Sequence, residues 1–186
     1  MPKVTIVACT TEPEKIPEPI LSRFMLRPVL EAYTEEEGAK IAKVMARTVL
    51  VGLPEPSPGN FRTISSAANA NPRAIRRLLT TLRDLAIVGG LVPTARGGYS
   101  MGDVLAMHDV TEDGLDRTAR RYLDLLVNEF GGKAGARAIA SRLGVSPADA
   151  ELLLMDRGFL IRTTTGREIT PLGVRRTVAL AVAAVK

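Results

Sequence analysis

The chain of 186 residues is 46% hydrophobic and 24% charged, with no tryptophan and a single cysteine. These values indicate a soluble globular protein with an aliphatic core, in one large or two small domains, and they exclude an internal disulfide. No apolar stretch is long enough for a signal peptide or a membrane span. One histidine and one cysteine provide no metal site. We therefore expect a cytoplasmic protein with no metal and no membrane partner.

The net charge of +5 is unevenly distributed along the chain. Residues 1–114 carry 13 basic and 13 acidic side chains, whereas residues 115–186 carry 12 and 7, so the whole excess lies in the C-terminal part. This asymmetry favours a C-terminal module that faces a polyanion, although many basic proteins bind no nucleic acid.

The first segment predicts strands that lack neighbours. Residues 3–9 form a β-branched apolar run, which is typical of a strand covered on both faces in a parallel sheet. Thr10 and Thr11 follow at its carboxyl end, where open α/β sheets place their ligand chemistry. The next candidate strand is 25–30. Because two strands cannot form an independently stable sheet, residues 1–30 are expected to end a larger α/β domain or to borrow strands from a partner.

Residues 31–110 predict a four-helix piece. A capping box at Thr34 and Glu37 begins a helix that runs to about residue 50. Further helices are expected near 61–70, from Asn71 and Pro72 onward, and over 103–107.

Arg73 lies in the first turn of the helix that Asn71 begins. A cation there opposes the helix dipole, at a cost of about 0.3–1 kcal/mol unless an anion lies nearby. Together with the amide groups of the helix start, Arg73 could read a phosphate. A solvated arginine that points away fits the local sequence equally well.

Residues 115–186 predict a winged helix, that is, three helices followed by a β-hairpin. The expected elements are a helix from Asp116, helices over 136–143 and from Ser146, strands over 159–162 and 167–170 with a glycine at the hairpin tip, and a closing helix from Pro171. The second helix of the helix-turn-helix would normally enter the major groove.

Charge argues against that second helix as the DNA contact. It carries Asp149, Glu151 and Asp156 against one arginine, a balance that repels phosphate. Arg162 and Arg167 flank the small turn of the hairpin, so we predict that the hairpin binds the DNA backbone or minor groove with little sequence reading. The remaining arginines of this part, Arg120, Arg121, Arg137 and Arg142, are expected on solvated helix faces.

Several segments, in collinear order, resemble the RuvB family of AAA+ ATPases, which drive branch migration of Holliday junctions. Residues 4–11 (VTIVACTT) are similar to the sensor-one strand, 19–24 (PILSRF) to the segment that ends in the arginine finger, 71–79 (NPRAIRRLL) to the sensor-two helix, 114–116 and 130–132 to the start of the DNA-binding domain, and 157–167 (RGFLIRTTTGR) to its wing. The resemblance covers nearly the whole chain.

The resemblance implies a mainly α fold with little β structure. Residues 1–30 would be the edge of an AAA+ α/β core, 31–110 a four-helix AAA+ lid, and 115–186 a winged-helix DNA-binding domain. The implied function is that of the C-terminal part of an ATP-dependent DNA motor in Holliday junction branch migration, recombination and repair.

The resemblance also implies roles for individual side chains. Arg73, beside Pro72, would touch the phosphates of a nucleotide in its own subunit. Arg23 would act in trans as an arginine finger toward the γ-phosphate of a neighbour. Thr10 or Thr11 would sense the γ-phosphate or help to place the attacking water, and the sequence does not choose between them.

The phosphoryl chemistry of the family also needs a phosphate-cradling loop and a magnesium-binding acid, and no stretch of this sequence fits either. We therefore expect ATP or ADP with magnesium only in an intact assembly, and no hydrolysis by this chain alone. The implied partners are branched or duplex DNA and an N-terminal ATPase portion or neighbouring subunits in a hexameric ring, with a RuvA-like partner left open.

Two other interpretations stay open at this point. One is a non-catalytic DNA-binding or assembly protein that retains the lid and the wing. The other is a different AAA+ protein, such as a replication loader, with a lid and a winged helix.

Overall fold

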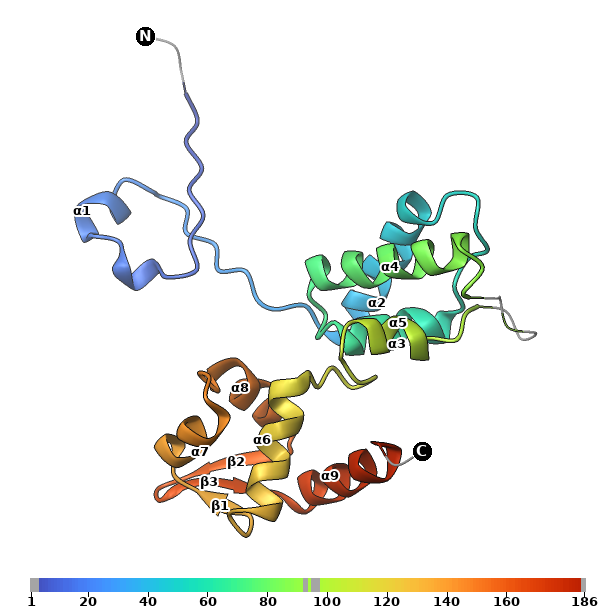
Figure 1. The fold of residues 1–186 in the computed structure, drawn as a ribbon. Helices are drawn as coiled ribbons and strands as arrows, with labels where there is room; N and C mark the ends of the chain where they lie inside the picture. Colours follow the sequence, from blue (N-terminus) through green and yellow to red (C-terminus); the bar gives the residue numbers. More distant parts are fainter. Residues whose placement is uncertain (1–3, 92–93, 95–97, 185–186) are drawn as a thin grey trace. The chain divides into compact units, whose positions relative to one another are not determined.

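The computed structural model describes residues 4–91, 94 and 98–184, and the chain divides into two units, Met1–Glu31 and Ala32–Lys186 (Figure 1). Its described elements are mostly helices with one three-stranded sheet, which confirms the predicted mainly α fold with little β structure. None of the described helices combines the length and the apolar character needed to cross a bilayer.

The first unit contains only two short helical segments among its described residues, η1 (Pro13–Lys15) and α1 (Glu18–Leu21). The strand prediction is wrong for residues 4–9 and 25–30, and residue 3 lies outside the described residues. Large apolar side chains in both runs are more than 70% exposed. A strand needs a neighbour for its backbone hydrogen bonds, and the described part of this unit supplies none, so the runs stay uncovered.

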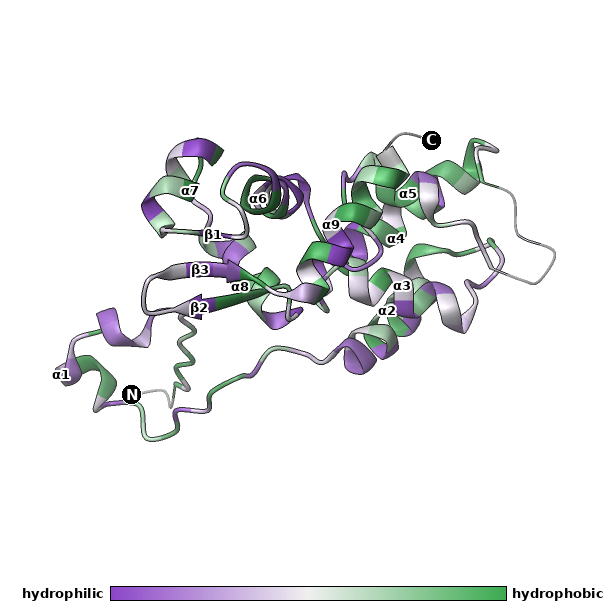
Figure 2. Ribbon diagram, turned by 90° about the horizontal axis from the view of Figure 1, so that it is seen from below, coloured by the Kyte–Doolittle hydropathy of each residue, from purple (hydrophilic) through white to green (hydrophobic). Residues whose placement is uncertain are grey.

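The second unit begins with four helices around one hydrophobic core: α2 (Glu35–Val49), α3 (Pro58–Ala67), α4 (Pro72–Ile87) and α5 (Gly102–Met107). The capping box is present, because the Thr34 hydroxyl accepts from the amide of Glu37 while the carboxylate of Glu37 accepts from the amide of Thr34. Figure 2 shows the acidic first turn of α2 in purple. Helix α2 packs on α3 and α4, and α5 packs on α4.

Helix α3 differs from the prediction at both ends. It begins at Pro58, because Ser57 and Asn60 form a second capping box. It ends at Ala67, because Asn69 and Ala70 adopt left-handed backbone conformations, with φ of +50° and +53°. These two residues form a sharp turn directly before α4.

The second core is enclosed by the C-terminal elements: α6 (Arg117–Asn128), β1 (Lys133–Ala134), α7 (Ala136–Leu143), α8 (Ala148–Asp156), β2 (Leu160–Thr163), β3 (Gly166–Ile169) and α9 (Pro171–Ala184). The strands form an antiparallel sheet in the order β1-β3-β2. Helix α6 contributes Tyr122, Leu123 and Leu126, all fully buried, to this core.

The hairpin glycine is not at the tip. Thr164 and Thr165 form the turn, and Gly166 is already paired with Thr163 in the ladder, with φ of +153°. A Cβ at Gly166 would collide with the carbonyl oxygen of Ala134, so glycine is required where β1 approaches β3. The sequence did not predict β1, because two residues among glycines carry no strand signal.

Candidate functional site

The first turn of α4 presents an exposed cation, Arg73. The side-chain oxygen of Asn71 accepts from the amides of Arg73 at 3.0 Å and Ala74 at 3.4 Å, so the cap already uses two of the amides available to an anion. The side chain of Arg73 is exposed and makes no hydrogen bond or ion pair with any residue that the structure describes. Any anion bound here would therefore be held chiefly by the guanidinium, beside Pro72 at the first helical position.

The predicted residues of the first unit are likewise at its surface. Arg23 follows α1, is exposed, and has no ion-pair or hydrogen-bond partner for its side chain among the described residues. The Thr10 hydroxyl accepts from the amide of Glu12 at 3.0 Å, and Thr11 is exposed. Arg73 and Arg23 thus carry uncompensated charge, whereas the Thr10 hydroxyl is engaged by the amide of Glu12.

The wing arginines are brought together by one carboxylate from α8. Oε1 of Glu151 lies 3.0 Å from Nη2 of Arg162, 2.6 Å from Nη2 of Arg167 and 2.7 Å from Nε of Arg167. The Glu151 side chain is only 7% exposed and that of Arg167 19%, whereas Arg162 is 62% exposed. Arg167 is therefore directed inward, and Arg162 keeps most of its guanidinium in solvent.

This geometry corrects the charge argument about α8. Glu151 was expected to repel phosphate with Asp149 and Asp156, but only the latter two are exposed. Glu151 shares the inward face of the helix with Ala150 and Leu154, and two arginines neutralise it. The helical spacing of that apolar face was the signal that could have placed it inside.

The electrostatics of the cluster follow from its burial. Desolvation alone would raise the pKa of Glu151, but hydrogen bonds from Arg167 and Arg162 outweigh it and hold the pKa below its usual value. Burial, reinforced by the charge of Glu151, raises the pKa of Tyr122 to about 12. Its hydroxyl is buried without a hydrogen bond of standard geometry in the described structure, a feature that the sequence did not reveal.

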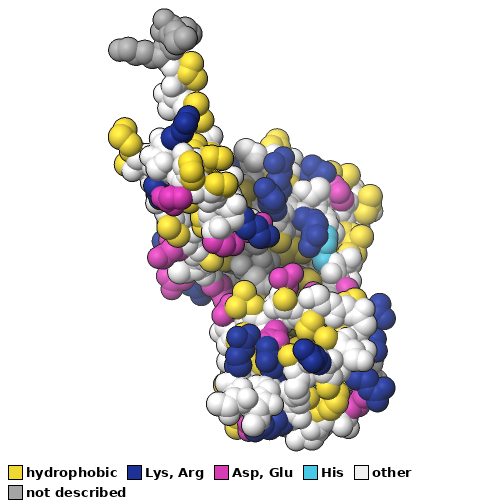
Figure 3. Space-filling model, turned by 90° about the vertical axis from the view of Figure 1, so that its left-hand side faces the viewer, with side chains coloured by type: hydrophobic (Ala, Val, Ile, Leu, Met, Phe, Trp, Pro, Cys, Tyr) yellow, Lys and Arg dark blue, Asp and Glu magenta, His cyan; other side chains and the backbone are white. Residues whose placement is uncertain are grey.

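Basic side chains gather on one face of the winged-helix module. Figure 3 shows several Lys and Arg side chains on that face, with fewer acidic ones between them. Arg142 of α7 is 65% exposed and pairs with Glu129 at 2.9 Å, the kind of solvated surface pair that the sequence predicts. A surface of this kind attracts phosphate over some distance, while individual exposed pairs contribute little to stability.

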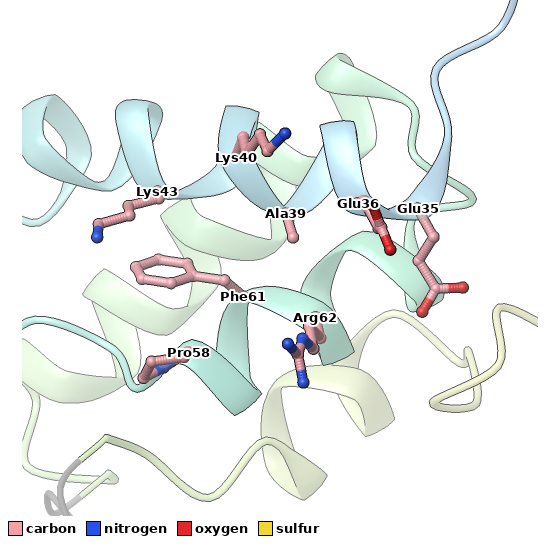
Figure 4. A pocket seen from close by; sticks show the side chains of 8 residues that line it. All are labelled: Glu35, Glu36, Ala39, Lys40, Lys43, Pro58, Phe61 and Arg62. Atoms are coloured by element: carbon pink, nitrogen blue, oxygen red, sulfur yellow. The ribbon is translucent and has the colours of Figure 1, made fainter.

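A groove lies between α2 and α3, with a volume of about 690 Å³ (Figure 4). Its lining residues are Glu35, Glu36, Ala39, Lys40, Lys43, Pro58, Phe61 and Arg62. None of the predicted site residues lines it. In residues 4–91, 94 and 98–184, no three His, Cys, Asp or Glu side chains are grouped as a metal site.

The fold is that of a four-helix lid followed by a winged-helix module. Residues 112–176 match the family described as the RuvB C-terminal winged helix domain. Among curated proteins, the Holliday junction branch migration complex subunit RuvB of Synechococcus sp. (strain CC9605) is 33% identical over 91% of this chain and 49% of its own length. The same subunit of Bifidobacterium longum is 30% identical, over 92% and 49%.

The solved structures agree with the sequence comparison. The structure described as the Thermotoga maritima RuvB Holliday junction branch migration motor has a TM-score of 0.67 and 25% identity, covering 87% of this chain and 54% of that one. The resemblance to RuvB is thereby confirmed: residues 112–176 match its C-terminal winged helix domain, and most of this chain is similar to RuvB proteins. It spans about half the length of the curated relatives that it matches.

Proposed function

We propose that this chain works as the C-terminal part of a RuvB-like, ATP-dependent DNA motor in Holliday junction branch migration, and that it binds DNA through its wing. The observation that carries the proposal is the exposed guanidinium of Arg162, held at the hairpin by a buried carboxylate. The names of the relatives, together with the similarity along the lid and the winged helix, support branch migration as the process.

The two wing arginines take different roles in this proposal. Arg162 contacts a backbone phosphate, because its pair with Glu151 uses one nitrogen and leaves other N–H donors in solvent. Arg167 does not reach the DNA. It fixes β3 on α8 through Glu151, so that Arg162 stands on a rigid support. A phosphate contact of this kind positions the duplex and carries no direct sequence information.

Salt dependence of DNA binding tests the assignment of Arg162. Arg162→Ala should weaken binding to unrelated duplex sequences alike and reduce the salt slope of log K by about 0.9, the contribution of one phosphate contact. Arg142→Ala is the matched control, since Arg142 is equally exposed and also paired with a glutamate. A slope that Arg162→Ala leaves unchanged, or that both variants change alike, would contradict the proposal.

The nucleotide-facing part of the proposal concerns Arg73 and Arg23. Both guanidinium groups are exposed and have no ion-pair partner among the described residues, which fits groups that await an anion. In an intact ring, Arg73 would hold the phosphates of ATP or ADP in its own subunit and Arg23 those of a neighbour. Thr10 or Thr11 would lie near the γ-phosphate. A nucleotide with magnesium supplies the phosphoryl transfer, and an ATPase portion outside these residues would bind its remaining groups.

A further inference from the structure

An arginine outside the wing connects the winged helix to the lid. Arg157 ends α8, and its guanidinium donates to the Oε2 of Glu35 at 3.3 Å, the backbone oxygen of Ser66 at 3.1 Å and the Oδ1 of Asn69 at 3.1 Å. The acceptors come from α2, from α3 and from the turn after α3. The side chain of Arg157 is only 25% exposed, which distinguishes it from a solvated surface arginine.

Asn69 of the lid contacts the winged-helix part of the chain at two points, Arg157 and Gly114. Its Oδ1 accepts from Arg157, and its Nδ2 donates to the backbone oxygen of Gly114 at 3.3 Å. Gly114 has φ of +81°, and a Cβ there would lie 2.5 Å from the Oδ1 of Asn69 and 2.7 Å from the oxygen of Ser66. The close approach therefore requires glycine.

The connector between the lid and the winged helix, residues 109–114, is held by contacts with the winged helix. Nε and Nη2 of Arg176, on α9, donate to the two carboxylate oxygens of Asp113 at 2.7 and 2.6 Å, and Thr111 donates to Asp113 at 2.6 Å. Arg120 of α6 pairs with Asp109. Residues 109–114 are thus held by the winged helix, while Val110 also packs on the core of the lid. Beside this connector, the contacts of Asn69 and Arg157 join the two modules directly.

The same turn begins α4. Asn71 follows Asn69 by two residues and caps the amides of Arg73 and Ala74. Asn69 and Ala70 both have left-handed backbone conformations, which asparagine tolerates but which cost about 1–2 kcal/mol at Ala70, so the contacts of the turn hold Ala70 in a strained conformation. One turn therefore connects Arg73 at the helix start to the winged helix.

We infer that Arg157 and Asn69 form an interdomain latch. Through this latch, the turn that begins α4 holds the winged helix and the lid together as one rigid body. Given the proposed function, a shift of α4 when Arg73 meets a nucleotide would move the wing directly. The latch itself is a property of this chain and needs neither nucleotide nor DNA.

Distance distributions between two spin labels test the latch. The labels are placed at Lys43→Cys on α2 and Thr164→Cys on the wing turn, both exposed, in a Cys9→Ser background. The parent should show one narrow distribution. Arg157→Ala and Asn69→Gly should each broaden it and add separations absent from the parent. Asn69→Gly removes the amide while suiting the left-handed backbone, so it should stay folded, as far-UV circular dichroism will check.

Arg142→Ala serves as the control for loss of a surface arginine and should leave the distribution narrow. A parent that is already broad, or a distribution equally narrow in both latch variants, overturns the inference. DNA binding is measured on the same proteins. Arg157→Ala should keep the parent's salt slope. If Arg157→Ala instead lowers the salt slope as Arg162→Ala does, while the distribution of spin-label distances stays narrow, then Arg157 contacts DNA and the latch is overturned. Failure of every protein to bind DNA counts against the proposed function alone.

Discussion

At the scale of single residues, Glu151 joins both wing arginines to α8. A buried carboxylate is costly unless charged donors compensate it, and here two arginines from neighbouring strands do so. The ion pairs hold β2 and β3 in a fixed position against α8. The exposed pair of Arg142 with Glu129 has no such consequence.

Glu151→Gln should therefore destabilise the protein. The amide keeps the shape of the side chain but removes the charge that faces the largely buried Arg167, which costs about 1.5–3 kcal/mol for hydrogen bonds to a charged group. Urea unfolding at pH 7 measures the change, with Asp149→Asn on the exposed side of α8 as the matched control. Equal stabilities of the two variants would show that the cluster contributes little.

The same carboxylate predicts how stability depends on pH. Because the pKa of Glu151 is lower in the folded protein than in the unfolded chain, its stabilisation is complete above the unfolded value of about 4 and is lost as the pH falls through the folded pKa. Asp113 behaves alike: burial would raise its pKa, but Arg176 and Thr111 lower it overall. The urea concentration at the midpoint of unfolding should therefore decrease as the pH falls below 4, and it should decrease less steeply in Glu151→Gln.

At the scale of elements, the cap of α4 is the clearest local device. Asn71→Ala removes the acceptor for two amides and should cost about 1 kcal/mol, the usual effect of losing an N-cap. Thermal unfolding detects it, and Asn128→Ala at the exposed end of α6 is the control. No change in Asn71→Ala relative to that control would mean that water replaces the cap at no cost.

The hairpin makes a second prediction at this scale. Gly166→Ala introduces a Cβ against the carbonyl oxygen of Ala134 and places alanine at φ of +153°, so the pairing of β1 with β3 should be lost at a cost of about 1–3 kcal/mol. Gly135→Ala, where a Cβ meets nothing within 4 Å, should be tolerated. Amide hydrogen exchange of β1 and β3 distinguishes the two, and retained protection in Gly166→Ala would contradict the packing argument.

At the scale of the whole molecule, the two units differ in completeness. The second unit encloses two cores, whereas the described residues of the first leave both of its apolar runs uncovered. Large exposed apolar surfaces are typical of sites that bind another molecule. This agrees with a chain that spans half the length of its relatives and with the proposal that further ATPase structure completes the site.

We accordingly expect no magnesium-dependent ATP hydrolysis by the purified chain. A separately purified ATPase core from a RuvB relative should gain activity when this chain is added, because in the proposed role Arg23 would stabilise charge that develops on the phosphate. Arg23→Ala should abolish the gain, whereas Arg27→Ala, in the same unit, should retain it. Phosphate release by this chain alone would contradict the expectation.

The amino-acid sequence by itself determined where most helices lie and several of their caps, because these depend on residues three or four positions apart, although it did not place the cap of α3 at Ser57. Thr34, Asn71 and Asp116 all cap the helices that their sequence neighbourhood predicts. The order of the segments also sufficed for the resemblance to RuvB, which the comparisons confirmed.

Only the tertiary structure decided which charges are free. Glu151 and Arg167 lie 16 residues apart, and Arg157 reaches acceptors 88 to 122 residues away, separations at which no local pattern records a contact. The missing strands have the same cause, since a strand forms only where a neighbour pairs with it. Packing between distant segments, rather than local preference, thus separates the arginine that faces solvent from those that hold the fold together.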